Sequence, residues 1–258
     1  MNNLIYELKD RVAYLTLNRP EKRNALGSEL VAELTEAFAQ IAKDDSAKVV
    51  VLKAAGKVFC AGADLAYLQT LQSNTYAENL EDSLQLKKLF HTIYTFPKVV
   101  IAQVHGHAIA GGCGLANVCD FVFSVPNVKF GYTEVKIGFI PAIVKVFLIR
   151  KIGESRAKQL LLSGDLIDSQ TAFDYGIVNY LVEAENLETE VNTFAQRLCT
   201  QNSAQSMSLT KEMIGKIQEM NLEDALYYAS EMNAKARASE DCKKGIGAFL
   251  NKEKIEWT

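Results

Sequence analysis

Runs of apolar residues in the first half of the chain predict a set of β-strands. Leu4–Leu8 and Val12–Leu17 flank a short charged turn and together predict a hairpin. Val49–Leu52 and Val99–Val104 are nearly continuous apolar runs, which are typical of strands covered on both faces. Phe121–Val125 predicts one more strand.

Between these strands, apolar residues recur at the spacing of a helix. One stripe from Leu30 to Ile41 predicts an amphipathic helix with Ser28 as its N-cap. A second helix is predicted at Glu78–Tyr94, before Pro97. Strands that alternate with helices indicate crossover connections. We therefore expect an α/β fold with a largely parallel sheet.

From about Gly138 onward the pattern is mostly helical. Ser239, followed by Glu240 and Asp241, predicts the N-terminus of the last helix. We expect an α/β core at residues 1–200 and a helical C-terminal subdomain at 201–258. The predicted helices are Ile143–Lys151, Glu154–Leu162, Leu187–Leu198, Met207–Ile217, Leu222–Lys235 and Cys242–Asn251.

The composition of the 258 residues, 48% hydrophobic and 23% charged, indicates a globular protein with a sizeable core. Its net charge of −3 gives no basic surface for nucleic acid or an anionic membrane. The N-terminal MNNLIYELKD lacks the apolar region and cleavage site of an export signal. No apolar run approaches the roughly 18 residues of a membrane span. We therefore expect a cytoplasmic protein with neither nucleic acid nor a membrane as partner.

Five widely spaced cysteines, with no CxxC pair, favour neither a disulfide framework nor a zinc site. We expect all five to be small buried residues. His105 and His107 would point to the same face of an extended segment, but no third ligand stands at a supporting spacing. We therefore predict that both are structural or line a pocket, and that the protein has no metal site.

Two turns rich in small residues follow predicted strands. They are Phe59–Leu65 (FCAGADL) and His105–Gly114 (HGHAIAGGCG). In open parallel sheets, ligands bind at the carboxyl ends of the strands. Small residues allow a substrate to approach backbone amides closely. Two such turns on neighbouring strands could therefore direct two amides at one oxygen, as an oxyanion hole does. Neither turn matches a P-loop or a dinucleotide-binding pattern.

The chain resembles the crotonase (enoyl-CoA hydratase/isomerase) superfamily in several segments that follow in the family's order. FCAGADL is similar to the family pattern FxAGxDL, and GHAIAGGCGLANVCD is similar to GxAxGGGxxLALxCD. FGYTEVKIGFIP resembles FGxPExxLGxxP. The remaining matches are LNRPEKRNAL, LLLSGDLIDSQTAFDYGIVNYLV and SEDCKKGIGAFLNKE. Together they cover nearly the whole length.

The resemblance implies a spiral of ββα units with a helical trimerisation region that also covers the active site. It implies an acyl-CoA thioester substrate, no cofactor beyond the coenzyme A of the substrate, and a homotrimer or a dimer of trimers. The amides of Ala63 and Gly111 would form the oxyanion hole, and Glu134 would transfer protons. Residues implied in substrate binding are Ala61, Gly62, Asp64, Leu65, Gly114 and Thr133, and those implied in CoA binding are Lys22, Arg23 and Ala25. Asp64 and Asp120 are also predicted to cap helix or turn amides rather than to act as acids or bases.

One departure from the family pattern bears on the chemistry. Typical hydratases have two glutamates that handle the water and the Cα proton. Here the second is Glu134, but Gly114 stands at the first position. Hydratases that act on 3-methylglutaconyl-CoA resemble this chain, with glycine at the first position and a segment similar to Pro141–Val144. An enoyl-CoA hydratase, with 3-methylglutaconyl-CoA as one candidate substrate, is therefore the leading hypothesis.

Three alternatives stay open. Δ3,Δ2-Enoyl-CoA isomerases also manage with one glutamate. 3-Hydroxyisobutyryl-CoA hydrolases share the glycine but usually have aspartate where this chain has Ala142, and this hypothesis has the least support. The third alternative is a CoA-thioester-binding scaffold without turnover. An RNA-binding branch of the family carries a lysine-rich helix after the NAL motif, whereas the helix here has several glutamates and only Lys43 at its end. We therefore predict no RNA binding.

Overall fold

The main sheet contains the predicted hairpin and the predicted buried strands. The structure, a computed structural model, describes residues 2–257, without the side chain of Leu65. The strand order is β1-β2-β3-β4-β6-β9, and β1 pairs with β2 in antiparallel fashion while the other neighbours are parallel. The expected α/β fold with a largely parallel sheet is therefore confirmed. The strands are β1 (Leu4–Lys9), β2 (Val12–Leu17), β3 (Val49–Ala54), β4 (Val99–Val104), β6 (Phe121–Ser124) and β9 (Tyr180–Leu181).

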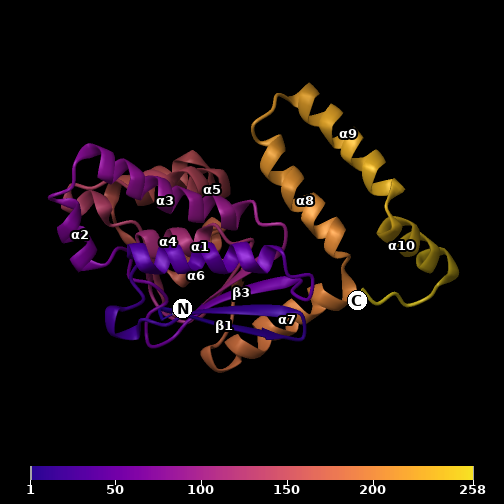
Figure 1. Cartoon of the computed structure of the whole chain (residues 1–258), viewed down its shortest axis with the longest axis horizontal. Coiled ribbons are helices and arrows are strands. Elements are labelled where there is room, and N and C mark those ends of the chain that lie inside the picture. The colour runs from indigo at the N-terminus through magenta and orange to yellow at the C-terminus, as the bar shows by residue number, and fades with distance from the viewer. Residues whose placement is uncertain (1, 258) are drawn as a thin grey trace.

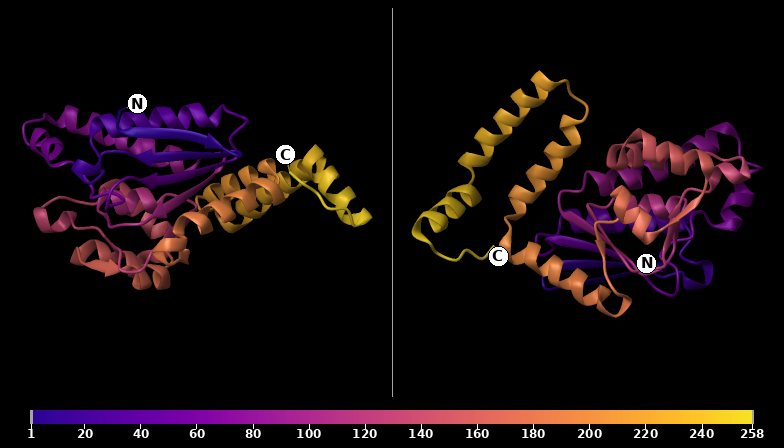
Figure 2. Two further views of the ribbon diagram at one scale, coloured as in Figure 1. Left: turned by 90° about the horizontal axis from the view of Figure 1, so that it is seen from below. Right: turned by 180° about the vertical axis from the view of Figure 1, so that it is seen from behind.

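Helices cover both faces of this sheet, as Figures 1 and 2 show. Helices α1 (Ser28–Ala42) and α3 (Tyr76–Tyr94) lie side by side. Helix α7 (Leu187–Gln201) packs on β2, β3, β4 and β6. Its Phe194 ring packs edge-on against Phe121, with 4.9 Å between the ring centroids. Every residue of β4 is buried, which explains why that segment reads as a continuous apolar run.

A second, three-stranded sheet lies beside the candidate site. Its strand order is β5-β7-β8, with β5 (Ala108–Ile109), β7 (Lys129–Gly131) and β8 (Leu166–Asp168). The short helical segments of the core are η1 (Pro20–Lys22), α2 (Leu65–Leu71), α4 (Gly111–Asn117), η2 (Glu134–Ile137), α6 (Ser169–Tyr175) and η3 (Ala184–Asn186).

The predicted helices of the second half are present, and their caps show where the sequence was informative. The two helices predicted around position 153 form α5 (Ala142–Ser163), which is broken at Gly153 with φ 77° and ψ 166°. Ser239 caps α10 (Glu240–Asn251) by accepting a hydrogen bond from the Cys242 amide at 3.2 Å, as predicted. The prediction for α1 was wrong by one residue, because Gly27 is the N-cap and Ser28 already has a helical backbone.

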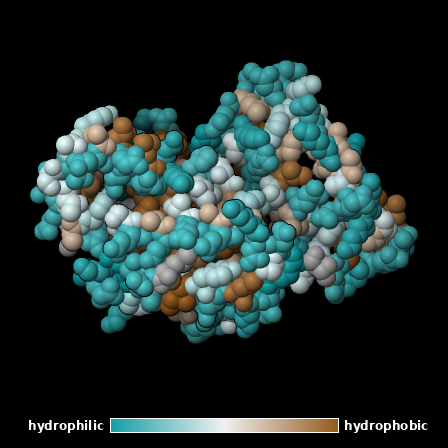
Figure 3. Space-filling model, viewed as in Figure 1, coloured by the Kyte–Doolittle hydropathy of each residue, from teal (hydrophilic) through white to brown (hydrophobic). Residues whose placement is uncertain are grey.

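The C-terminal helices extend away from the α/β core as an arm (Figures 1 and 2). The arm consists of α8 (Ala204–Ile217), α9 (Leu222–Ala238) and α10, and Met232 is its buried hydrophobic residue. Large apolar side chains remain exposed on it, including Leu222 at 77% and Phe249 at 82%. Brown patches on the arm are visible in Figure 3. The predicted roles of residues 201–258 in trimerisation and active-site cover stay predictions.

The cysteine prediction holds for four residues and fails for one. Cys60, Cys113, Cys119 and Cys199 are buried, whereas Cys242 is partly exposed because it lies on the arm. Within residues 2–257, no helix is both long and apolar enough to cross a membrane.

Candidate active site

The two turns that the sequence singled out lie side by side. The Cys60 amide donates to the His107 carbonyl at 3.2 Å, and the Ile109 amide donates to the Cys60 carbonyl at 3.0 Å. Cys60 thereby forms a parallel bridge with Ala108, the first residue of β5. The turn after β3 is thus joined by backbone hydrogen bonds to the turn after β4, as the oxyanion-hole hypothesis requires.

Ala63 carries the first of the two candidate amides. Leu26 bridges to it in parallel fashion, donating to the Gly62 carbonyl at 2.7 Å and accepting from the Asp64 amide at 2.9 Å. In this pattern, the peptide groups of Ala63 itself face away from Leu26. Among the described residues, none accepts a hydrogen bond from the Ala63 amide. The amide is therefore available for a substrate oxygen.

Gly111 carries the second amide, at the start of α4. Ala110 before it has φ 51° and ψ −123°, a conformation that non-glycine residues rarely adopt. Its own amide donates to the Gly131 carbonyl at 2.7 Å, which helps to hold this backbone in place. Backbone strain of this kind is often found at active sites. No described residue accepts from the Gly111 amide, which stands at the positive end of a short helix.

Glycine at position 62 allows the two turns to approach each other. A Cβ atom there would lie 2.9 Å from the Ala110 Cβ and 3.7 Å from the Gly111 nitrogen, and Gly62 has φ 94°. Both the close contact and the positive φ require glycine. Position 62 therefore sets the spacing between the two amide-bearing turns.

A third segment, the loop from Arg19 to Ala25, borders the first turn. Asn24 is fully buried, and its side chain donates to the carbonyls of Ala55 and Val58, both at 2.8 Å. The Ala61 amide donates to the Arg23 carbonyl at 3.1 Å. The loop is therefore joined by hydrogen bonds to the turn that carries Ala63.

The three residues implied in CoA binding lie on this loop in different environments. Lys22 and Arg23 are exposed, so their cations are accessible to phosphate groups. Ala25 is buried, and its carbonyl accepts from Arg19 Nη1 at 3.0 Å. Their role in CoA binding stays a prediction.

Asp64 acts on the protein itself. Its Oδ1 accepts from the Ala66 amide at 2.9 Å and caps α2, and its Oδ2 pairs with Arg19 at 3.0 Å. Burial disfavours the charged carboxylate, but the Ala66 amide, Lys22 and Arg19 outweigh it and lower the pKa of Asp64. The capping interpretation is confirmed. A substrate contact of Asp64, which the resemblance implied, stays a prediction.

Arg19 and Asn24 are site residues that the sequence analysis did not select. Arg19 lies in the NRP part of the LNRPEKRNAL segment and Asn24 in its NAL part, so the family resemblance could have identified both residues. The side chain of Leu65, another residue implied in substrate binding, lies outside the described part of the structure.

Glu134 opens η2, next to the end of β7. Its Oε2 atom is buried and has no hydrogen-bond partner among the described residues. Burial raises the pKa of this carboxyl, and only its own backbone amide opposes the shift. Lys136 does not pair with it, because Lys136 Nζ binds Asp165 at 3.2 Å. A partly desolvated carboxyl with one unpaired oxygen is suited to exchange protons with a substrate.

Glu134 lies within electrostatic reach of α4. Its charge contributes to raising the pKa of Cys113 to about 12, although burial of that thiol is the larger cause. Thr133 precedes Glu134 and is partly exposed. Gly114 is buried in α4, where an added Cβ atom would meet Val144 and Phe90, and its role in substrate binding stays a prediction.

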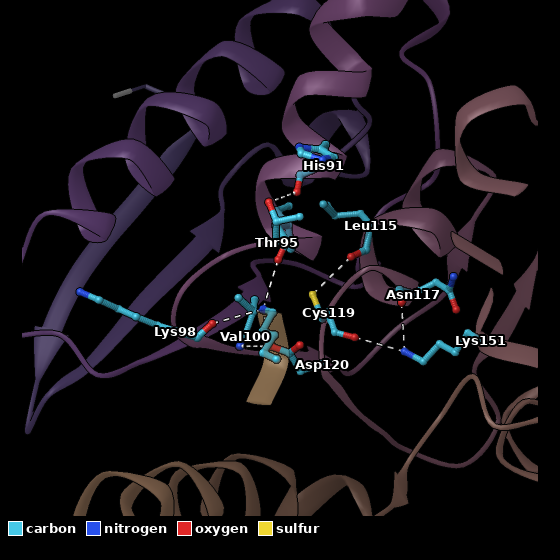
Figure 4. Close-up of polar contacts among 11 residues, drawn as sticks. His91, Thr95, Lys98, Val100, Leu115, Asn117, Cys119, Asp120 and Lys151 are labelled. Atoms are coloured by element: carbon cyan, nitrogen blue, oxygen red, sulfur yellow. Dashed lines mark hydrogen bonds and ion pairs between the residues drawn. The ribbon is translucent and has the colours of Figure 1, made fainter. Parts of the chain in front are cut away.

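A lysine of α5 holds the far end of α4. Lys151 Nζ donates to the carbonyls of Asn117 at 3.0 Å and Cys119 at 3.2 Å, as Figure 4 shows. Burial lowers the pKa of Lys151. A cation at this end complements the helix dipole. The side chain of Lys151 therefore anchors the helix whose first residue is Gly111.

Asp120 continues this network, but the amide that it binds lies in strand β4 and not in a helix or a turn, so the predicted capping role is not the one observed. It accepts from the Val100 amide at 2.7 Å (Figure 4), and it pairs with Lys211 of the arm at 2.7 Å. Lys151 and Lys211 were missed from the sequence because nothing in a helical pattern marks which lysine is buried.

Replacing Lys151 with methionine should lower both stability and activity. The substitution keeps an apolar stem of similar length but leaves two buried carbonyls without their donor, at a cost of about 1–3 kcal/mol. Thermal unfolding and a hydration assay check this. Lys145→Met, at an exposed site on the same helix, is the matched control and should leave both unchanged. Equal behaviour of the two variants would contradict the anchoring role.

The two histidines have structural partners. His105 Nε2 lies 2.9 Å from the Gly56 carbonyl, and His107 Nδ1 accepts from the Lys129 amide at 3.1 Å. In the described part of the chain, no three His, Cys, Asp or Glu residues are arranged to hold a metal. Both histidines thus bind backbone groups of the protein, which agrees with the structural interpretation, and the absence of a metal site stays a prediction.

A surface cavity also lies away from these turns. It has a volume of about 540 Å³ and is lined by residues of β9, α6 and α7, such as Phe173, Tyr180 and Glu190. It contains no candidate site residue. We assign the active site to the paired amides and Glu134, because these groups can stabilise an oxyanion and transfer a proton, whereas a cavity volume alone cannot.

Comparisons with known proteins agree with this geometry. The sequence profile of the enoyl-CoA hydratase/isomerase family matches residues 7–258. A Thermus thermophilus protein that carries an enoyl-CoA hydratase name is 42% identical over 244 residues, 95% of this chain and 96% of that protein. The crotonyl-CoA hydratase of Syntrophomonas wolfei is 34% identical over 257 residues, 99% of this chain and 97% of that one.

A solved structure extends the agreement to the fold. The enoyl-CoA hydratase of Mycobacterium smegmatis superposes with a TM-score of 0.92 at 30% identity, covering 100% of this chain and 99% of that one. The crotonase-like spiral α/β fold with C-terminal helices is thereby confirmed. The paired turns, the partly buried Glu134 and these full-length matches lead to one conclusion: the chain belongs to the enoyl-CoA hydratase/isomerase family of the crotonase superfamily.

Proposed function

We propose that this enzyme adds water across the α,β double bond of an enoyl-CoA thioester. The amides of Ala63 and Gly111 bind the thioester oxygen, and Glu134 transfers the protons. The observation that carries the proposal is the combination of two amides on adjoining turns with a carboxyl whose buried Oε2 atom, like those amides, has no hydrogen-bond partner among the described residues. The hydratase names of the relatives, among them a short-chain-enoyl-CoA hydratase of Clostridium acetobutylicum, support the reaction type.

The proposed reaction uses one carboxylate twice. Glu134 takes a proton from water while the water oxygen bonds to Cβ, and the π electrons move onto the thioester oxygen. The two amides stabilise the resulting enolate because they are already oriented toward that oxygen. Protonated Glu134 then gives its proton to Cα, and the carbonyl forms again. The product is the 3-hydroxyacyl-CoA.

For the substrate, we propose 3-methylglutaconyl-CoA. Gly114 and the Pro141–Val144 segment support it through their resemblance to hydratases of that branched substrate. The test compares turnover of 3-methylglutaconyl-CoA and crotonyl-CoA, with products identified by mass. We expect the gain of one water and a higher kcat/KM for the branched substrate. A preference for crotonyl-CoA would overturn the substrate proposal and leave the reaction type intact.

The second candidate reaction is Δ3,Δ2-enoyl-CoA isomerisation, which the single glutamate favours. It moves a proton between Cα and Cγ without water, so a 3-enoyl-CoA substrate distinguishes it. If no enoyl-CoA gains water and the 3-enoyl-CoA is converted, the isomerase replaces the hydratase. Tight binding of CoA thioesters without turnover would indicate the non-enzymatic scaffold.

We also propose a cytoplasmic homotrimer or dimer of trimers. The exposed apolar side chains of the arm, such as Leu222, Leu226 and Phe249, support assembly because a monomer would leave them in water. Light scattering on the purified protein tests this, and a monomer would contradict it.

A further inference from the structure

The space around Gly114 cannot hold a side chain in this structure. A Cβ atom at this position would lie 2.2 Å from Val144 Cγ1 and 2.9 Å from Val144 Cβ. The Phe90 ring would lie 3.0 Å away. Non-bonded carbon atoms do not approach to 2.2 Å, so Val144 is the main obstacle.

Val144 has little freedom to move out of this space. Its side chain is 4% exposed. It lies in the first turn of α5, the helix that begins directly after Pro141. A β-branched side chain in a helix strongly prefers one rotamer. Phe90 behind it is fully buried and packs near Phe147, with 6.3 Å between the ring centroids. The contact is therefore part of a close-packed core.

We infer that Val144 is the residue that limits this active site to one carboxylate, because it fills the space that a glutamate at position 114 would need. The inference deepens the proposed function and rests on it for its meaning in catalysis. The apolar contact lies between α4 and α5, and α5 also contacts η2, the segment that Glu134 opens. The single glutamate is thus a property of the pair Gly114 and Val144 rather than of position 114 alone.

The limitation has a consequence for proton transfer. Two neighbouring carboxylates raise the pKa of one of them, because like charges disfavour ionisation of both. With Val144 in place, no carboxylate among the described residues shifts the pKa of Glu134. A second carboxylate admitted at position 114 should therefore change the pH dependence of catalysis as well as its rate.

A thermal-unfolding cycle tests the packing without any need for turnover. Gly114→Ala should lower the melting temperature by about 5 °C, because overpacking a core is destabilising. In a Val144→Gly background the same substitution should cost less than half of that. Val144→Ala should give an intermediate result because its Cβ would still lie 2.9 Å from the new atom.

Val146→Gly is the matched control, since Val146 lies on the same helix and is 49% exposed. It should weaken the helix without relieving Gly114→Ala. The inference is overturned if Gly114→Ala leaves the melting temperature unchanged, or if Val146→Gly relieves it as well as Val144→Gly does.

A second experiment measures whether a glutamate at position 114 takes part in catalysis once the Val144 side chain is removed. Gly114→Glu should be destabilised and slow, whereas Gly114→Glu with Val144→Gly should hydrate crotonyl-CoA at least about tenfold faster than Gly114→Glu alone. For the double variant, the fall of kcat/KM toward acid pH should also occur at a higher pH than in the wild type. Equal rates and profiles for the two variants would overturn the role of Val144.

The two proposals fail separately. If wild-type protein hydrates no enoyl-CoA, the proposed function fails, while the unfolding cycle still decides whether Val144 excludes a side chain at position 114. If hydration is observed and the cycle shows no coupling, only the inference about Val144 fails.

Discussion

Replacing Glu134 with glutamine should lower kcat for hydration by about 10²–10⁴-fold, because general acid–base groups contribute about that much. The amide cannot take a proton from water or return one to Cα. The fold should persist, since glutamine matches the size of glutamate and the buried Oε2 atom has no described partner to lose. Stopped-flow or steady-state assays with a melting curve measure both.

The control for this substitution is Glu185→Gln, on the exposed segment η3. It removes a carboxylate of the same kind away from the site and should leave kcat unchanged. If Glu134→Gln keeps more than about half of the wild-type rate, another group moves the protons and the proposed role of Glu134 is wrong.

The raised pKa of Glu134 predicts the direction of the pH dependence. Burial disfavours the carboxylate, so kcat/KM should fall as the pH drops through a value above the usual glutamate pKa of about 4.3. The pKa of Glu134 is higher in the folded protein than in the unfolded chain. At pH values between these two pKa values, the folded protein binds more protons at this carboxyl than the unfolded chain does. Stability from this group therefore decreases as the pH rises through that window. Glu134→Gln should remove both effects.

Replacing Ala63 with proline should lower kcat/KM by about 10²–10³-fold, the effect of losing one oxyanion-hole donor. Proline removes the N–H group, and no described residue depends on that group as a donor. Gly62 before it has no Cβ to clash with the proline ring. The loss should appear mainly in kcat, because the enolate oxygen carries more charge than the ground-state carbonyl.

Ala204→Pro is the matched control. Ala204 is the first residue of α8, where proline is well tolerated because that amide is not needed in the helix. It should fold and hydrate normally. A folded Ala63→Pro protein with nearly wild-type kcat/KM would show that the Ala63 amide does not bind the reacting oxygen.

Local patterns determined much of the fold. Continuous apolar runs such as Val99–Val104 and helical stripes such as Leu30 to Ile41 predicted elements that the structure contains. Burial on both faces or along one face imposes these periods on the sequence itself. Where two neighbouring residues could cap the same helix, as at Gly27 and Ser28, the local pattern placed the start one residue late.

The sequence by itself determined which residues could do chemistry, namely the two small-residue turns and Glu134, through motifs that extend along the whole chain. Tertiary structure alone decided how they are used. Only the fold shows that Cys60 pairs with Ala108, that Lys151 anchors α4, and that Val144 fills the space at Gly114. These contacts join residues far apart in the chain. A single sequence carries no record of which distant side chain occupies a given volume, because close packing depends on the assembled core.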